Sequence, residues 1–389
     1  MNRVCSIFSQ MLQQFPRLEF EAAVREHRAE RHARGFRCWT QFVAMLFCQL
    51  GHAQTLREIT GGLAACEGKL RHLGVDSPPK RSTLAYANEH RPWQLFQTVF
   101  ERFYQRCRAE AAQRGQRKFR FKHKLLSLDA TMIPLCLSVF DWALYRRTKG
   151  AVKLHLILDH DGYLPQFAVV TAGKTSEIEV ARRQRFEPGT MLVFDRGYTD
   201  IHWWLELSRQ KVFFVTRLKD NIEYGIVEQR AVKPASEIVR DEVVLLVKVQ
   251  EEGRVGLMRR IEVWVEQKQE MMVFLTNQLK LAASTIAAVY RDRWQIEQFF
   301  RALKQSLRIK TFVGTSANAV LVQIWTALIA MLLVRYLQLR STFGWSLSNL
   351  VALLRQQLFV YRDLMKWLNQ PFESPPELLP AEQLTLELG

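Results

Sequence analysis

The 389-residue sequence is poor in the cysteine patterns that mark disulfide-stapled or zinc-binding proteins. None of its six cysteines forms a Cys-x-x-Cys pair, and no cysteine–histidine group has the spacing of zinc ligands. We therefore expect reduced thiols of the cytosol, with no disulfide framework and no zinc site. The six are Cys5, Cys38, Cys48, Cys66, Cys107 and Cys136.

Long hydrophobic runs are also missing. The first 17 residues mix polar and apolar side chains, so no export signal is expected. The most apolar window, residues 317–334, is interrupted by Asn318, Gln323 and Thr326. A bilayer span needs about 20 apolar residues. The window is therefore predicted to be a buried helix, and no membrane partner is expected.

Acidic residues are too few to balance the basic ones. There are 38 Asp and Glu against 55 Lys and Arg, which gives a net charge of +17. This excess favours a polyanion partner, nucleic acid before an acidic membrane surface. Residues 1–124 hold 22 of the basic and 10 of the acidic residues. The N-terminal third is therefore predicted to hold DNA, with an ordinary solvated basic surface as the alternative.

That third has helical periodicity. Apolar residues recur at helical spacing over residues 39–50, and a second helix capped by Thr55 follows. A third, short helix is predicted to open at Lys80 and Arg81, with Ser82 as its cap. The arrangement resembles a helix-turn-helix, in which a helix N-terminus beside basic side chains contacts phosphate. An ordinary three-helix bundle remains the alternative.

From residue 124 the pattern changes to strands. Three strands, a helix, a strand, a helix and a strand follow one another, which is the order of an α/β, RNase H-like fold. Short strands then indicate a β-rich insertion before a long helix over residues 287–304. The predicted domains are a helical DNA-binding domain at 1–120, the first part of the RNase H-like catalytic core at 121–216, the β-rich insertion at 217–285, the second part of the core at 286–340, and a C-terminal helical segment with an acidic, proline-rich and loosely ordered tail at 341–389.

Three carboxylates occupy positions that suit a metal site. Asp129 interrupts an apolar strand, Asp195 closes another, and Glu297 lies near the apolar face of the long helix. Each alone fits a cap or an ion pair, but the first and fourth strands of an RNase H-like sheet are neighbours, so the three could converge. Convergent oxygens suit Mg²⁺ or Mn²⁺, and two such ions can hold the attacking and leaving oxygens of a phosphoryl transfer.

The helix around Glu297 carries a more specific pattern. Tyr290, Arg293, Glu297 and Lys304 follow the spacing Y-x2-R-x3-E-x6-K and fall on one helical face. Two cations and a phenol beside a metal carboxylate suit phosphate clamping. An ordinary amphipathic helix would place apolar residues or alternating charges there.

These motifs resemble the DDE transposases of the IS-four type, encoded by bacterial insertion sequences, whose YREK signature has this spacing. The strand around Asp129 and the string Phe194-Asp195-Arg196-Gly197-Tyr198 resemble the family's two aspartate motifs. The resemblance covers about residues 40–340. It implies an RNase H-like core, catalysis by Asp129, Asp195 and Glu297 with two Mg²⁺ or Mn²⁺ ions, and cut-and-paste movement of a DNA element.

The resemblance also implies DNA contacts and an assembly. Tyr290, Arg293 and Lys304 would hold the backbone of the transposon end, with Arg196 of the second aspartate motif beside them. Trp264 is the candidate to stack on a flipped base, although a strand-core aromatic is the alternative. The active species is expected to be a dimer that bridges two ends and meets target DNA, in the bacterial cytoplasm in association with the nucleoid.

Two other readings of the sequence are weaker. The string Gly173-Lys174-Thr175 suggests a phosphate-binding loop, but Ala168 stands where that motif needs glycine, so ATP is not expected. A nuclease of the same fold that cuts without joining stays open. A DNA-binding regulator with a dead site also stays open, although the three intact carboxylates disfavour it.

Overall fold

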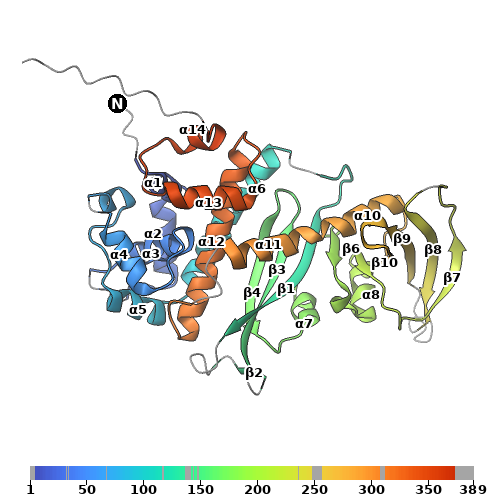
Figure 1. Ribbon diagram of the computed structural model, residues 1–389. Coiled ribbons are helices and arrows are strands. Elements are labelled where there is room, and N and C mark those ends of the chain that lie inside the picture. The colour runs from blue at the N-terminus through green and yellow to red at the C-terminus, as the bar shows by residue number, and fades with distance from the viewer. Residues whose placement is uncertain are drawn as a thin grey trace, which may run out of the picture.

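A computed structural model describes residues 5–31, 33, 35–66, 68–115, 118–135, 142, 144–146, 149–234, 236–247, 256–306 and 312–372. Cys136 and the tail beyond residue 372, including the predicted loose order there, lie outside this range. Figure 1 shows a mixed α/β protein in which helices from both ends of the chain pack at one side of a large sheet.

The N-terminal third is helical, as predicted. Helix α3 is followed by Gly51, and Thr55 caps α4 by accepting a 3.1 Å hydrogen bond from the Glu58 N–H. The predicted Ser82 cap is wrong, because α5 begins at Arg81 directly after the extended Lys80 and no side chain caps it. The elements are α1 (Ile7–Leu12), α2 (Arg17–Glu26), α3 (Cys38–Leu50), α4 (Leu56–Ala64), η1 (Leu70–Leu73), α5 (Arg81–His90) and α6 (Gln94–Gln113).

The centre of the molecule is a mixed sheet. Strand β1 lies between β3, which is antiparallel to it, and β5, which is parallel to it, and β6 is parallel to β5. The predicted order of strands and helices is therefore confirmed over this part, except for the short strand β2, which was not predicted. The elements are β1 (Leu125–Leu135), β2 (Leu144–Arg146), β3 (Lys149–Asp159), β4 (Leu164–Ala172), α7 (Glu177–Arg182), β5 (Met191–Phe194), η3 (Arg196–Tyr198), α8 (Ile201–Arg209) and β6 (Phe213–Arg217).

The turn between β3 and β4 explains one glycine. Gly162 has a φ of +84°, a conformation that favours glycine. A Cβ at this position would lie 3.1 Å from the Cβ of Ala111 on α6. The Asp161-Gly162 pair predicts the hairpin turn, and the structure adds that the turn packs tightly against the helical layer.

The β-rich insertion extends the central sheet. Strand β10 pairs antiparallel with β6, and the sheet continues through β9 and β8 to β7 at the edge, far from the helical layer in Figure 1. The sequence did not indicate β7, whose residues are almost all exposed and therefore lack an apolar alternation. The elements are β7 (Tyr224–Gln229), β8 (Ile238–Leu246), β9 (Leu257–Val265), η4 (Glu266–Lys268) and β10 (Glu270–Thr276).

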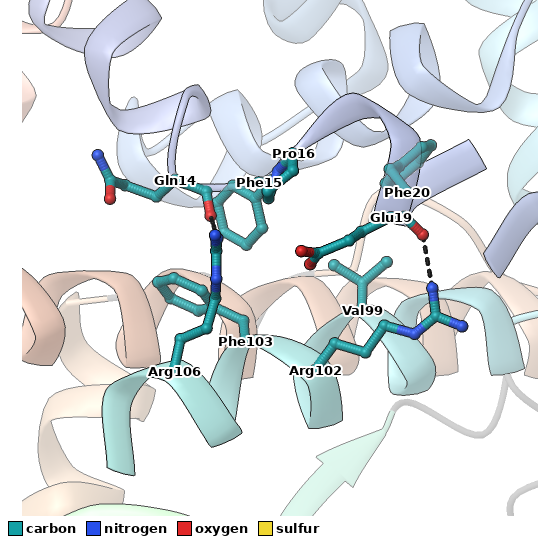
Figure 2. A pocket seen from close by; sticks show the side chains of 9 residues that line it. All are labelled: Gln14, Phe15, Pro16, Glu19, Phe20, Val99, Arg102, Phe103 and Arg106. Atoms are coloured by element: carbon teal, nitrogen blue, oxygen red, sulfur yellow. Dashed lines mark hydrogen bonds between the residues drawn. The ribbon is translucent and has the colours of Figure 1, made fainter. Parts of the chain in front are cut away.

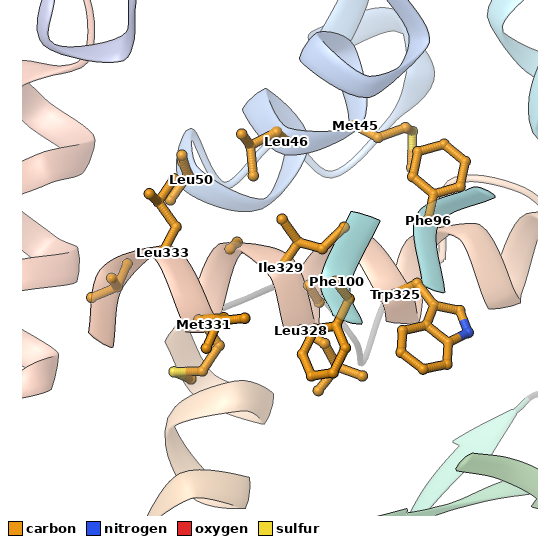
Figure 3. Packing of buried hydrophobic residues seen from close by; sticks show 14 of the residues in the cluster. Met45, Leu46, Leu50, Phe96, Phe100, Trp325, Leu328, Ile329, Met331 and Leu333 are labelled. Carbon is orange, nitrogen blue, oxygen red and sulfur yellow. The ribbon is translucent and has the colours of Figure 1, made fainter. Parts of the chain in front are cut away.

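The helical layer is built around α12 (Ala317–Arg340). Figure 3 shows its side chains, such as Leu328 and Ile329, packed against α3 and α6. By length and composition α12 could cross a membrane, but 83% of its most apolar window is buried in the protein, which confirms the predicted interior helix. Helices α13 (Leu347–Gln357) and α14 (Leu364–Asn369) join the same core. Helices from before residue 120 and from after residue 340 share this hydrophobic core, so the domain boundaries at 120 and 340 stay predictions.

The two helices that follow the β-rich insertion lie across one face of the sheet. Helix α10 (Ala283–Asp292) packs Ile286, Val289 and Tyr290 against β5 and β6, and α11 (Trp294–Ser306) continues over β1. The sequence predicted a single helix here. The structure instead interrupts it at Arg293, so the predicted signature residues span a break between two helices.

Candidate active site

Asp129 and Asp195 lie on adjacent strands. Strands β1 and β5 run parallel, and the last register pair is Leu128 with Phe194. The predicted catalytic aspartates come next: Asp129 continues β1, and Asp195 directly follows the end of β5. The two carboxylates therefore stand side by side where the pairing of the strands ends, the edge at which open α/β sheets gather their functional groups.

Glu297 reaches the same place through Arg293. The Arg293 guanidinium donates from Nη2 to Glu297 Oε1 at 2.5 Å, and its Nη1 lies 3.7 Å from Asp129 Oδ2. Arg293 is 12% exposed, so solvent screens this network weakly. The helix break thus places one cation between two of the three predicted metal carboxylates.

The electrostatics of Asp129 show how crowded the site is. Burial raises the pKa of the Asp129 carboxyl to about 7, against the lowering effects of the Ala130 N–H and of Arg293. The negative charges of Asp195 and Glu297 raise it further. A carboxyl that shares a site with two others is held closer to its neutral form, and an added cation relieves this.

Asp195 depends on the glycine that follows its strand. Its Oδ1 accepts the Gly197 N–H at 2.7 Å, and a Cβ on Gly197 would lie 2.8 Å from that oxygen. The same Cβ would lie 3.5 Å from Glu177 Oε2, so a fourth carboxylate approaches this turn. Because it lies at the start of a helix, Glu177 would be expected from the sequence to act as a helix cap. Its place in the first turn of α7 gave no signal that the turn packs against Asp195.

The other signature residues lie on the same face. Lys304 on α11 donates to Thr131 Oγ1 on β1 at 2.6 Å. The Tyr290 ring is 7% exposed, packs against Phe274, and lies below the Arg293 guanidinium at 5.5 Å. Tyr290 therefore packs beneath the Arg293 side chain. Its predicted contact with DNA stays a prediction.

The donor set fits hard divalent cations by its chemistry, since carboxylate oxygens are the ligands that Mg²⁺ and Mn²⁺ prefer. Within the described ranges, no three Asp, Glu, His or Cys side chains are grouped closely enough to hold an ion. Asp129 and Glu297 instead share the positive charge of Arg293. The pKa of Asp129 stays raised beside this cation, mainly because the carboxyl is buried and to a smaller extent because Asp195 and Glu297 are negatively charged.

Two further predicted DNA contacts lie on the surface. Arg196 is exposed in η3, directly after Asp195. Trp264 on β9 is 37% exposed, and its Nε1 donates to Glu266 at 2.8 Å. This exposure disfavours the alternative of a strand-core aromatic, while stacking on a base stays a prediction.

The N-terminal helices form a basic cleft of about 740 Å³. Lys80 lines it together with Arg17, Arg37 and Arg71. Asp76 is the carboxylate of the lining, and Glu30 pairs with Arg37 at 3.2 Å from outside it. The uncapped first turn of α5 adjoins the cleft, because Thr83 also lines it. Arg81 is exposed beside it. The sequence singled out Lys80 and Arg81. It missed the three arginines because they come from separate segments.

A second hollow in this layer is too small to be a ligand site. Figure 2 shows it between the start of α2 and α6, where Arg102 and Arg106 donate to the backbone carbonyls of Glu19 and Gln14. Its volume is about 20 Å³, which is room for a water molecule.

Comparison with known proteins identifies the chain. The profile of the family described as "Transposase DDE domain" matches residues 120–333, which include all three carboxylates. The chain belongs to the DDE transposase family. Members are metal-dependent enzymes of DNA phosphoryl transfer that normally use divalent ions. The profile of a domain of unknown function, DUF4372, matches residues 4–76.

Curated relatives of this transposase support the assignment. The y4zB protein of Sinorhizobium fredii, named as a transposase, is 30% identical over 78% of this chain and 83% of its own length. The protein named as the transposase of insertion sequence element IS5377 from Geobacillus stearothermophilus is 29% identical over 66% and 67%. That named for element IS4SA in Synechocystis is 24% identical over 57% and 59%.

One solved structure aligns with much of the chain. The piggyBac transposase, in a cryo-EM synaptic complex with hairpin DNA, covers 95% of this transposase and 81% of its own chain. The sequence identity is 11% and the TM-score is 0.44. A likeness this weak adds nothing to the family assignment.

Proposed function

We propose that this transposase is a cut-and-paste enzyme of the IS-four type with an RNase H-like catalytic core. The observation that carries the proposal is the Arg293 bridge, which brings Glu297 of α11 to Asp129 of β1. Asp195 directly follows β5, the strand that pairs with β1 at this point. Tyr290 and Lys304 complete the YREK spacing on the same face. The strand order β4-β3-β1-β5-β6, with β3 antiparallel and β5 and β6 parallel to β1, supports the RNase H-like core.

The chemistry follows from the carboxylates. Asp129, Asp195 and Glu297 would hold two divalent ions, Mg²⁺ or Mn²⁺, which when bound supply activation of the attacking oxygen and stabilisation of the leaving oxygen. Burial raises the pKa of the Asp129 carboxyl to about 7, so without metal part of the molecules keep this proton at neutral pH, and a bound cation would favour the ionised form. No ATP is required.

The cations of the signature are proposed to hold DNA. Arg293 and Lys304 end within reach of β1 and would bind phosphates that flank the cleaved bond. This grip would keep the freed 3′-hydroxyl in the site until it attacks target DNA. Arg196 and Trp264 are proposed to contact the same transposon end from the surface.

The basic cleft is the proposed binding site for the terminal inverted repeats. Its four cations, Arg17, Arg37, Arg71 and Lys80, suit a phosphate backbone, and Arg81 would extend the contact. A monomer with one such cleft would hold one end. We therefore propose a dimer in the synaptic complex that bridges two ends, acting at the bacterial nucleoid.

The test is nicking of terminal-repeat DNA with Mg²⁺ by the full chain. Asp129→Asn, Asp195→Asn and Glu297→Gln should each abolish cleavage and leave end binding within about twofold, because the carboxylates serve the metal and not the DNA. Asp241→Asn, at a buried carboxylate of β8, is the matched control and should cut normally. Near wild-type cutting by any of the three variants would remove that residue from the site.

A further inference from the structure

A buried chain of hydrogen bonds lies next to the active site and takes no part in the chemistry above. Ser127 Oγ is 2.6 Å from His160 Nε2, and His160 Nδ1 is 2.6 Å from Asp292 Oδ2. The exposed fractions of the three residues are 0%, 4% and 3%. Ser127 lies on β1, His160 follows β3, and Asp292 is the last residue of α10.

The order Ser–His–Asp is that of a nucleophilic triad, but this one cannot act as such. A triad serine must present its hydroxyl to substrate. Ser127 has no exposed surface, so no substrate reaches its oxygen. We call the hydrogen-bonded chain of Ser127, His160 and Asp292 the relay. It must act on neighbouring residues of the protein and not on a substrate.

The residues next to this hydrogen-bonded chain are the proposed catalytic residues. Side chains two residues apart on a strand point to the same side, so Ser127, Asp129 and Thr131 of β1 all face the two helices. Ser127 reaches the end of α10 through His160, and Asp129 contacts Arg293 at the break. Thr131 accepts from Lys304 on α11. The relay and the Thr131 contact thus flank the Asp129–Arg293–Glu297 network on both sides.

Asp292 is held firmly enough to serve as an anchor. Lys118 lies 2.5 Å from its Oδ1, and the Tyr163 hydroxyl donates to the carboxylate at 3.3 Å. Burial favours its neutral acid, but the hydrogen bonds from His160 and Lys118 outweigh burial and hold the pKa of Asp292 below its ordinary value. The carboxylate directly before Arg293 therefore stays charged and fully engaged.

We propose that Ser127, His160 and Asp292 are positioning residues that set the helix break, and with it Arg293 and Glu297, against Asp129. The proposal rests on the proposed function, because it takes Asp129 and Glu297 as metal ligands. Groups that orient metal ligands typically affect metal affinity or activity by roughly 10–100-fold when they are removed. The relay should act in the same way, through the ligands and without touching DNA.

The experiment compares Asp292→Asn with Asp241→Asn in the full chain. Asp241 is also a buried aspartate, held by Arg259 at 2.6 and 2.7 Å, but it lies on β8, remote from β1. Mn²⁺ binding is measured without DNA by the EPR signal of the free ion, and single-turnover nicking by gel. Thermal unfolding shows whether each variant is folded.

We expect both variants to unfold at lower temperature, whereas only Asp292→Asn should raise the Mn²⁺ dissociation constant, by about 10-fold or more. Ser127→Ala should raise it in the same direction. If the three groups act as one unit, the double variant Ser127→Ala, Asp292→Asn should lose little more Mn²⁺ affinity than Asp292→Asn alone. Ser127→Ala also decides the case if Asp292→Asn does not fold, since it removes only one hydroxyl.

Two results would overturn the inference. One is an unchanged Mn²⁺ affinity and nicking rate in the folded relay variants. The other is an equal loss of Mn²⁺ affinity in Asp241→Asn, which would reduce the effect to general destabilisation. The proposed function fails separately, if Asp129→Asn nicks DNA as fast as the wild type.

Discussion

Removing the charge of Asp129 should stabilise the metal-free protein. Burial and the neighbouring carboxylates raise the pKa of this carboxyl from its ordinary value of 3.8 to about 7. One pKa unit corresponds to about 1.4 kcal/mol, so ionising Asp129 costs the folded state at most about 4 kcal/mol. Asp129→Asn avoids this cost and can still accept the Ala130 N–H. We expect a gain of about 2–4 kcal/mol at pH 8 in EDTA.

The stability difference between Asp129→Asn and the wild type should depend on pH in one direction. A carboxyl with a raised folded pKa binds its proton more tightly in the folded state, so its ionisation destabilises the fold as pH rises from about 4 to about 7. The advantage of Asp129→Asn should therefore be absent below pH 4, grow up to pH 7 and stay constant above it. For a chain of this length the gain corresponds to roughly 3–5 °C in Tm.

The assay is thermal unfolding of both proteins between pH 4 and pH 8.5, with and without Mn²⁺. Asp292→Asn is the control of opposite sign, because the pKa of Asp292 is lowered and its charge stabilises the fold above pH 4. Added Mn²⁺ should raise the Tm of the wild type and not that of Asp129→Asn. A metal-free Asp129→Asn that is less stable than the wild type at pH 8 would refute the reasoning.

Two more predictions concern DNA binding and Asp195. Replacing both Arg71 and Lys80 with Ala should weaken binding of terminal repeats and flatten its dependence on salt by about one unit per lost phosphate contact, as filter binding from 50 to 200 mM salt would show. The double replacement of Arg185 and Arg209, which are exposed and do not line the cleft, is the matched control and should change neither. An unchanged slope would remove the cleft from the DNA interface. Gly197→Ala should slow nicking by at least 10-fold without weakening end binding, because its Cβ would displace the Asp195 carboxylate; a normal nicking rate would contradict this.

Local patterns predicted the parts of the site that lie within single segments. Asp129 and Asp195 stood out because each interrupts or closes an apolar strand, and Glu297 because of the spacing around it. The geometry then followed from one register pair, Leu128 with Phe194, which places the two aspartates together.

The parts that were missed depend on pairing between distant segments. N-terminal and C-terminal helices pack around α12 in one shared core. Neither this packing nor the pairing of β10 with β6 produces a periodic pattern within a single segment of the sequence. No sequence pattern singled out His160 or Asp292. Their bond spans 132 residues, which local spacing cannot show.

The most direct test of the central claim is joining of pre-nicked terminal-repeat DNA to a plasmid target, with Mg²⁺ and the full chain. A cut-and-paste enzyme must keep the freed 3′-hydroxyl in its site. The wild type should therefore yield joined product from a two-end complex, while Arg293→Ala and Lys304→Ala should lose joining at least as severely as first-strand nicking. A wild type that nicks these ends efficiently but never joins them would contradict the claim and identify a nuclease instead.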